Sequence, residues 1–227
     1  MAAELRGSLP AVLITAVLLP PWLDRLLLQP KCPICSKRSA DRSLCMSCRR
    51  RLQLDAAGVQ GQCPLPWWAL GLYQEGLRQQ LLQLRRQANP RLLQAWGKQL
   101  AGQLPDLGVP LLITAIPARR PGGQPLPMQL ATVIAKCGGH QLLPALQRRR
   151  ACLGQHHLSR AQRLSNLEGV FHCPQPAGPE LRPLLLVDDI LTTGATAMAA
   201  MAALESAGHA LLGLACLART PAPKRRD

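Results

Sequence analysis

Aromatic residues are scarce in this chain of 227 residues: one Phe, one Tyr and four Trp make up 3% of it. So few rings argue against a stacking platform for single-stranded nucleic acid, and they leave a core built from Leu, Ala, Val and Ile. Acidic residues are also few, 12 against 27 Lys and Arg, and the formal net charge is +15. This excess of positive charge indicates anionic ligands or a polyanionic partner.

An uninterrupted apolar run of the ~20 residues that a transmembrane helix needs is also missing. Residues 9–23 are apolar, but three prolines interrupt them and no small-residue cleavage site is apparent. We expect residues 1–30 to form an apolar N-terminal helix that packs on the body of the protein. Membrane association through this segment, or a signal sequence, is the alternative interpretation. The chain length allows one α/β core and a small module beside it.

Cysteines, in contrast, number nine, and four of them form two C-x₂-C pairs with nine residues between the pairs. The four are Cys32, Cys35, Cys45 and Cys48. Four thiolates supply the tetrahedral sulfur coordination that Zn²⁺ prefers and leave no position for water. We predict a structural zinc site in a small module of residues 31–66, in a reducing compartment that we take to be the cytoplasm. Cys63 is expected to be a buried thiol beside Trp67 and Trp68.

Basic residues surround the two cysteine pairs. They are Lys31, Lys37, Arg38, Arg42, Arg49, Arg50 and Arg51. Their charge would lower the pKa values of the thiols and offset the negative charge of a Zn(Cys)₄ centre. The same residues can meet DNA or RNA phosphates, and an ordinary solvated basic face explains them equally well.

The most informative stretch is residues 184–196, LLLVDDILTTGAT. Its first four residues are apolar and β-favouring, as in a strand buried on both faces of a parallel sheet. Asp188 and Asp189 follow at the end of this strand. A short loop then leads into a helix-forming run, and it contains Thr192, Thr193, Gly194, Ala195 and Thr196. Two acids, three threonines and a glycine between a strand and a helix indicate a binding site.

The chemistry of this loop suits a sugar phosphate. Unsatisfied backbone N–H groups at a helix N-terminus, with the positive end of the helix dipole, favour a phosphate there. Threonine hydroxyls add donors, and Gly194 lets the backbone approach a phosphate oxygen. Asp188 and Asp189 would repel a bare phosphate, but they can accept hydrogen bonds from sugar hydroxyls, directly or through Mg²⁺.

The segment VDDILTTGAT resembles the 5-phosphoribosyl 1-diphosphate (PRPP) signature of type I phosphoribosyltransferases. The resemblance implies that Asp188 and Asp189 hold the ribose hydroxyls and that Thr192 to Thr196 bind the 5′-phosphate, with Mg²⁺ accompanying PRPP. It implies an α/β fold with a parallel sheet flanked by helices, here residues 67–220. Purine-salvage members place an aspartate where Thr192 stands, so a hypoxanthine-type salvage enzyme is disfavoured.

The rest of the chain is consistent with this fold. Leucines at helical spacing in residues 72–104 are interrupted at Asn89-Pro90. Residues 109–117 are expected to form a second buried strand, residues 128–139 a helix ended by glycines, and residues 209–219 a further strand. The resemblance places a pyrophosphate-contacting segment at residues 115–120 and a mobile loop at residues 147–171. The tail, 221–227, is expected to be disordered.

The whole layout is similar to the ComF/GntX family, which is linked to natural competence and DNA uptake in bacteria. The resemblance depends on the cysteine quartet, on VDDILTTGAT and on a Q-x₂-L-x₄-R-x₂-N-x₄-F pattern. This pattern consists of Gln155, Leu158, Arg163, Asn166 and Phe171. Two departures occur: the R-G-F-N-Q motif of many members is replaced by RRPGGQPLPMQLA, and a common lysine by Arg85 or Arg86.

Three functions therefore remain open. The first is a Mg²⁺-dependent phosphoribosyltransferase acting on an unknown acceptor, in which Asp188 and Asp189 are the catalytic candidates. Arg119, Arg120 and the segment 148–163, which includes Arg163, would then neutralise the departing pyrophosphate. The second is a non-enzymatic competence factor that binds single-stranded DNA, with competence proteins such as a helicase as partners. The third is a PRPP-sensing regulator.

Overall fold

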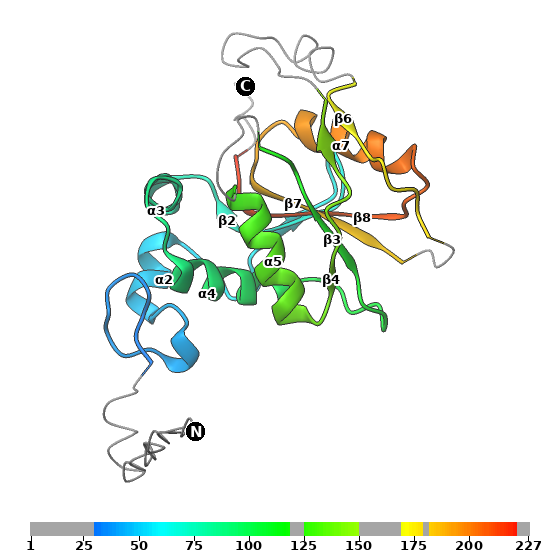
Figure 1. The fold of residues 1–227 in the computed structure, drawn as a ribbon. Coiled ribbons are helices and arrows are strands. Elements are labelled where there is room, and N and C mark those ends of the chain that lie inside the picture. The colour runs from blue at the N-terminus through cyan, green and yellow to red at the C-terminus, as the bar shows by residue number, and fades with distance from the viewer. Residues whose placement is uncertain (1–29, 119–124, 150–168, 179–181, 222–227) are drawn as a thin grey trace, which may run out of the picture.

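The computed structural model describes residues 30–118, 125–149, 169–178 and 182–221 (Figure 1). The predictions for the N-terminal helix and the C-terminal tail fall almost entirely outside these ranges. In the described part of the chain, no helix combines the length and the apolar character needed to cross a membrane.

A six-stranded sheet forms the centre of the molecule, with the strand order β1-β2-β8-β7-β3-β4. The strands are β1 (Val59–Gly61), β2 (Trp67–Leu72), β3 (Leu112–Ala115), β4 (Gln141–Leu142), β7 (Leu184–Leu191) and β8 (Leu211–Arg219). Only the edge pair β1–β2 is antiparallel, and every other neighbouring pair is parallel. A two-stranded antiparallel ribbon joins β5 (Gln147–Arg148) and β6 (Phe171–His172).

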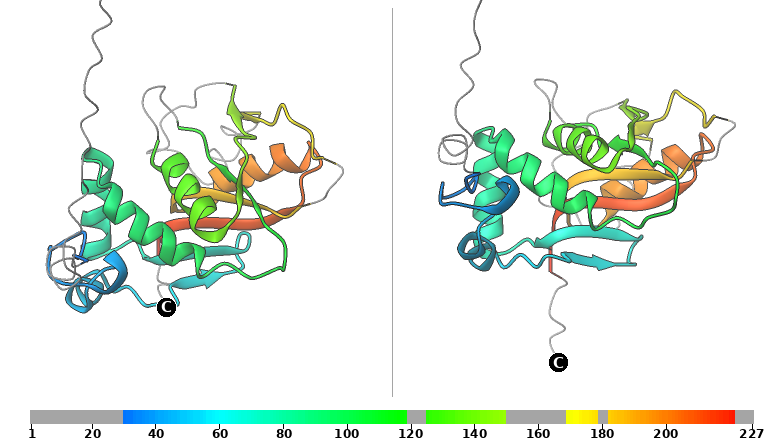
Figure 2. Two further views of the ribbon diagram at one scale, coloured as in Figure 1. Left: turned by 60° about the horizontal axis from the view of Figure 1, so that its bottom comes forward. Right: turned by 90° about the horizontal axis from the view of Figure 1, so that it is seen from below.

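Helices cover both faces of the sheet. The helices of the described residues are α2 (Met46–Leu52), which packs on α3, α3 (Glu75–Arg86), α4 (Pro90–Ala101), α5 (Leu126–Gly138) and α7 (Ala195–Glu205), with a short 3-10 turn η1 (Ala40–Arg42). Helices α4 and α5 pack together on one face, and α7 lies on the other (Figure 1). The predicted α/β class, with a mostly parallel sheet flanked by helices, is confirmed. The cysteine-bearing segment and α2 lie beside α3 and α4 (Figure 2).

Side chains of the central strand β7 alternate between two cores. Leu185 and Val187 belong to the core that contains α4 and α5, whereas Leu184 and Leu186 belong to the core that contains α7. All four side chains are fully buried, as expected for a strand covered on both faces. Since strand side chains alternate, residues 188 and 189 continue onto the α7 side and the α4–α5 side respectively.

The helical break at Asn89-Pro90 is confirmed. Helix α3 ends at Arg86, and α4 begins at Pro90, where the missing proline N–H costs nothing. The Asn89 side chain caps α4 by accepting a hydrogen bond from the Leu92 N–H at 3.0 Å.

One detail differs from expectation. Cys63 is exposed, so the prediction of a buried thiol is wrong. Its carbonyl accepts a hydrogen bond from Trp67 Nε1 at 3.1 Å. Trp67 and Trp68 instead begin β2, which pairs with β8. The boundary proposed between residues 66 and 67 stays a prediction, and β1 pairs with β2 across it.

Close packing of α4 on α5 depends on Gly97. A Cβ built at this residue would lie 2.4 Å from Val133 Cγ1 on α5, well inside van der Waals contact. Because valine is stiff at χ1, its methyl group cannot swing away cheaply. The two helices are therefore held at a distance that only glycine permits.

Overpacking in Gly97→Ala should cost about 1–3 kcal/mol against a gain in helix propensity of about 1 kcal/mol, so we expect the free energy of unfolding to fall by up to about 2 kcal/mol. Gly102→Ala, at the end of the same helix, is the matched control, because a Cβ there meets nothing closer than 3.6 Å. Urea denaturation measures both variants. A Gly97→Ala protein as stable as Gly102→Ala would contradict the packing described here.

Candidate functional site

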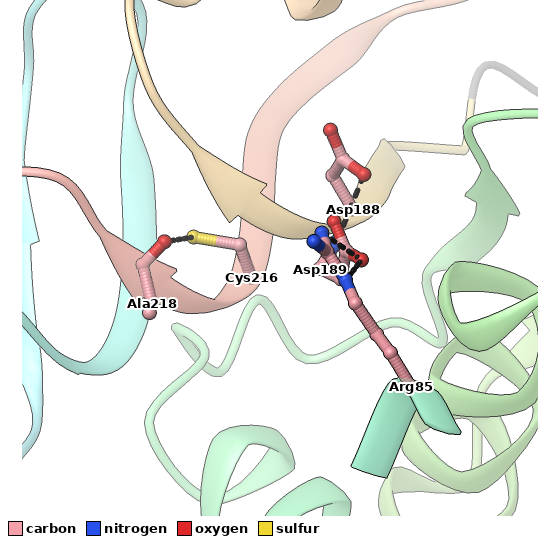
Figure 3. A network of polar contacts seen from close by, with 5 residues as sticks. All are labelled: Arg85, Asp188, Asp189, Cys216 and Ala218. Atoms are coloured by element: carbon pink, nitrogen blue, oxygen red, sulfur yellow. Dashed lines mark hydrogen bonds and ion pairs between the residues drawn. The ribbon is translucent and has the colours of Figure 1, made fainter. Parts of the chain in front are cut away.

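The acidic pair lies inside β7 rather than after it. The strand was predicted to end at Val187, but it continues to Leu191 because Ile190 and Leu191 still pair with Ala218 and Arg219 of β8. Asp188 and Asp189 therefore have strand geometry and point in different directions (Figure 3). This extension fixes which element each carboxylate can reach.

Asp189 forms an ion pair with Arg85 at the end of α3. Arg85 Nε donates to Asp189 Oδ2 at 2.8 Å, and Arg85 Nη2 donates to the same oxygen (Figure 3). The Asp189 side chain is 16% exposed and the Arg85 side chain 41%. The two residues are 104 positions apart in sequence, so this contact ties the helical region directly to the acidic pair.

Asp188 has a different environment. Its Oδ1 accepts a hydrogen bond from the Asp189 N–H at 2.8 Å, and its strand partner is the buried Cys216. Burial, and then the negative charge of Asp189, raises the pKa of Asp188 to about 8. A carboxyl group with such a pKa can donate or accept a hydrogen bond near neutral pH.

The loop after β7 turns sharply into α7 at Gly194. This residue has φ +82°, and a Cβ there would lie 2.3 Å from Pro64 Cγ, so glycine is required here whether or not a ligand approaches. Thr193 Oγ1 accepts a hydrogen bond from the Ala195 N–H at 3.4 Å. Ala195 is already the first residue of α7, so Thr196 belongs to the first turn of the helix rather than to the loop.

Arg219, at the end of β8, supports this loop from the side. Its Nη1 donates to the Leu191 carbonyl at 3.1 Å and also to the Thr192 carbonyl. Its guanidinium lies 5.7 Å from the centre of the Trp67 ring, within cation–π range. Arg219 therefore fixes the path of the chain as it leaves β7.

A cleft of about 870 Å³ opens at this edge of the sheet. Four of the predicted site residues line it: Asp188, Asp189, Thr192 and Thr196. Thr193, Gly194 and Ala195 do not line it, and the last two are buried. Other parts of its walls come from the turn between β2 and α3, from α3, from β5 and from the loop after β3, and include Tyr73, Arg85, Arg148 and Pro117.

The predicted pyrophosphate side of the cleft is described only in part. Arg119, Arg120 and Arg163 lie outside the described residues, as do Gln155, Leu158 and Asn166. Arg148 is described: its Nη2 donates to the Pro117 carbonyl at 3.3 Å, and its guanidinium lies 4.6 Å from the centre of the Phe171 ring. It places a positive charge beside the loop that follows β3, and the roles predicted for Arg119 and Arg120 in that loop stay predictions.

The four cysteines of the quartet come together as predicted. Cys32, Cys35, Cys45 and Cys48 are free thiols whose sulfur atoms all lie within 4.8 Å of one another. Zn–S bonds of about 2.3 Å in a tetrahedron place sulfurs about 3.8 Å apart, and the Cys35 and Cys45 sulfurs are 3.5 Å apart. The donor set and its spacing therefore fit a closed metal site, such as one for Zn²⁺.

Hydrogen bonding prepares one of these thiols for metal binding. The Ser47 hydroxyl, and then the backbone of Cys48, lowers the pKa of Cys45 to about 6, whereas burial raises the pKa of Cys48. The segment is also tied to the body of the protein, because Asn89 Nδ2 donates to the Pro33 carbonyl at 3.2 Å.

Two contacts at the site went unrecognised in the sequence. Arg85 was noted only as a replacement for a family lysine, and Arg219 only as the end of a strand. The position of Arg219 could have been predicted, because it ends the strand next to the acidic pair's strand and the ends of parallel strands meet at one edge of a sheet. No local pattern pairs Arg85 with Asp189, since they belong to elements far apart in the chain.

The raised pKa of Asp188 predicts a pH-dependent stability. The ordinary pKa of an aspartate is near 3.8, and that of Asp188 in the fold is about 8. Between these two pH values the folded protein holds a proton that the unfolded chain releases, so stability falls as pH rises through this window. Asp188→Asn keeps the acceptor for the Asp189 N–H but cannot ionise. We expect it to be more stable than wild type by about 2 kcal/mol at pH 8.5 and by much less near pH 5.

Urea denaturation at the two pH values measures this difference. Asp106→Asn is the control, because Asp106 is an acid outside the cleft whose carboxylate likewise accepts a backbone hydrogen bond, from Gly108. An Asp188→Asn gain that is equal at both pH values would rule out the proposed protonation.

Metal binding by the quartet predicts about one Zn per chain in a reducing preparation. Cys48→Ser is expected to reduce the zinc content to below about half and the free energy of unfolding by more than about 2 kcal/mol. Cys137→Ser, which alters an exposed thiol on α5, should keep both values. Mass-spectrometric metal analysis checks the zinc content, and wild-type protein without bound zinc would contradict the assignment.

Comparison with known proteins adds little to these observations. No family model and no curated protein matches the chain. A solved structure described as that of the allosteric regulatory enzyme of purine biosynthesis is similar over 56% of this chain, at 17% identity and a TM-score of 0.35. The match spans only 25% of that enzyme's chain. A likeness this distant supports no statement about what the present chain binds or does.

Proposed function

We propose that the chain binds the ribose 5-phosphate group of a ligand such as PRPP in the cleft at the end of β7. The observation behind this proposal is that one cleft holds two kinds of group, hydrogen-bond donors beside a helix N-terminus and acidic side chains that accept hydrogen bonds. Hydroxyls of Thr192 and Thr196 border it beside the N-terminus of α7, and the carboxyl groups of Asp188 and Asp189 border it next to them. A phosphate needs the first set, and sugar hydroxyls suit the second.

In this proposal each residue has a defined role. The carboxyl oxygens of Asp188 and Asp189 accept hydrogen bonds from the ribose hydroxyls. Of the five residues predicted to bind the 5′-phosphate, Thr192 to Thr196, the two that line the cleft, Thr192 and Thr196, supply hydroxyls and backbone N–H groups to it, and Thr193, Gly194 and Ala195 shape the turn between them. Arg219 acts indirectly: by holding the Leu191 and Thr192 carbonyls, it orients the loop before a ligand arrives, which reduces the entropy lost on binding.

Transfer of the phosphoribosyl group to an unidentified acceptor is the reaction that such a site would serve. The bond between the anomeric carbon and pyrophosphate breaks as a bond to the acceptor forms, and positive charge develops on the ribose. Arg148, in the cleft wall, is placed to stabilise the departing pyrophosphate. Arg119, Arg120 and Arg163 are further candidates for this role.

Membership of the ComF/GntX family, with a role in natural competence, remains part of the proposal. It is supported by the spacing and clustering of Cys32, Cys35, Cys45 and Cys48 and by the motif from Asp188 to Thr196. We assign the quartet to a structural zinc ion in a module of residues 31–66, and residues 67–220 to a phosphoribosyltransferase-like domain. Binding of single-stranded DNA and sensing of PRPP without catalysis are the alternatives.

Calorimetric titration tests the binding proposal. Wild-type protein is expected to bind PRPP and ribose 5-phosphate. At pH 8.5, above the pKa of about 8 of Asp188, Asp188→Asn, which keeps its size but cannot ionise, should weaken binding at least about tenfold. Thr192→Val, isosteric with threonine, removes one phosphate donor and should cost about fivefold. A wild-type protein that ignores both ligands would contradict the proposal.

Two further measurements separate transfer from binding alone. Release of pyrophosphate from PRPP, followed with a panel of acceptors, reports catalysis, and its absence with bound PRPP would favour the sensing alternative. Titration with a short single-stranded oligonucleotide reports the DNA alternative. The Asp188→Asn variant is the control, because nucleic-acid binding to the basic surface should not depend on this carboxyl group.

A further inference from the structure

The Arg85–Asp189 ion pair lies in the cleft for which the family resemblance implies Mg²⁺. Two nitrogens of one guanidinium contact a single carboxylate oxygen, and both residues line the cleft. Arg85 reaches this position from the last turn of α3, whereas Asp189 comes from the centre of the sheet (Figure 3). A positive charge from the protein itself already compensates this acid.

The acidic pair makes a poor Mg²⁺ site as it stands. Mg²⁺ favours octahedral oxygen coordination with negatively charged ligands. Asp189 already has a cationic partner, and the carboxylates of Asp188 and Asp189 point in different directions from adjacent strand positions (Figure 3). In the described ranges, no third acid or histidine joins them, and the cysteine quartet is the only cluster of three or more potential metal ligands.

We propose that Arg85 is the built-in counter-ion of the acidic pair and takes the place of a divalent cation, so that the cleft binds a ribose phosphate without metal. This inference rests on the proposed function and specifies its ligand chemistry. It replaces the Mg²⁺ that the family resemblance implied. An arginine can serve in this way because its guanidinium stays charged and has donors left over after pairing with Asp189.

Arg85 can contact a ligand while it stays paired with Asp189. Arg85 is 41% exposed, so it retains contact with solvent, and pairs at such exposure are held only weakly. A ribose hydroxyl can donate to the remaining Asp189 oxygen while Arg85 donates to an anionic group of the ligand. The arginine thereby binds acid and ligand together, as a metal ion does in other sugar-phosphate sites.

A metal titration tests the counter-ion role without any sugar ligand. Zinc-loaded protein is titrated with Mn²⁺, and binding is followed by the relaxation of water protons. Arg85→Gln should bind Mn²⁺ about tenfold more tightly than wild type, because a nearby positive charge is removed. Adding Asp189→Asn to this variant should abolish the gain.

Arg78→Gln is the matched control, because Arg78 lies on the same helix, is exposed and does not line the cleft. It removes the same charge and should behave as wild type. Arg85→Lys keeps the charge and should show no more than about twofold tighter Mn²⁺ binding. An equal gain in Arg78→Gln, or no gain in Arg85→Gln, overturns the inference.

A second titration uses ribose 5-phosphate, in buffer freed of metal by a chelating resin and in buffer with Mg²⁺. Wild-type affinity should agree within about twofold between the buffers, whereas Arg85→Gln should lose about tenfold without metal and recover part of it with Mg²⁺. Wild-type binding that requires Mg²⁺ overturns the counter-ion inference and leaves the proposed function standing. No binding in either buffer overturns both.

Discussion

The alternation of side chains along β7 is the constraint on which the site depends. Leu184 to Val187 divide between two separate cores, and this burial on both faces fixes the orientation of the strand. A shift by one residue would move every one of these side chains to the other core. Asp188 and Asp189 keep this alternation, because the strand partner of Asp188 is Cys216 in the core of Leu184 and Leu186, whereas Asp189 meets Arg85 of α3 on the other side. The packing of four apolar residues therefore helps to decide where each carboxyl group points.

The different electrostatic surroundings of Asp188 and Asp189 follow from this geometry. Asp189 lies on the side of α3 and finds Arg85, whereas Asp188 is left next to Cys216 and the Asp189 charge, with a raised pKa as the result. Among the described residues, Asp189 has an ion-pair partner and Asp188 has none. An apolar packing pattern thus produces two adjacent carboxyl groups in different surroundings, and the raised pKa of Asp188 is a feature typical of functional sites.

Local features of this fold were predictable from sequence, and long-range ones were not. The strand, loop and helix from Leu184 to Glu205, and the interruption at Asn89-Pro90, are set by neighbouring residues. The cysteine quartet was also predictable, because its spacing is itself the signal. In contrast, β2 was missed because its strand character depends on pairing with β8, and Cys63 was misplaced for the same reason. The contact between Arg85 and Asp189 joins residues 104 positions apart, so no local sequence pattern indicates it.

The cysteine segment is linked to the cleft through its packing on α3. Cys32 and Cys48 belong to the same core as Leu77, Leu81 and Leu84 of α3, and a Cβ at Gly76 would lie 2.7 Å from the Arg51 carbonyl, so α3 packs tightly on the chain that follows the quartet. Arg85 stands one residue after Leu84, at the end of that helix. A closed metal site would therefore fix the position of α3 and, through it, the reach of Arg85 to Asp189. The quartet would then contribute to the cleft without touching it, because it would hold the helix from which Arg85 reaches Asp189.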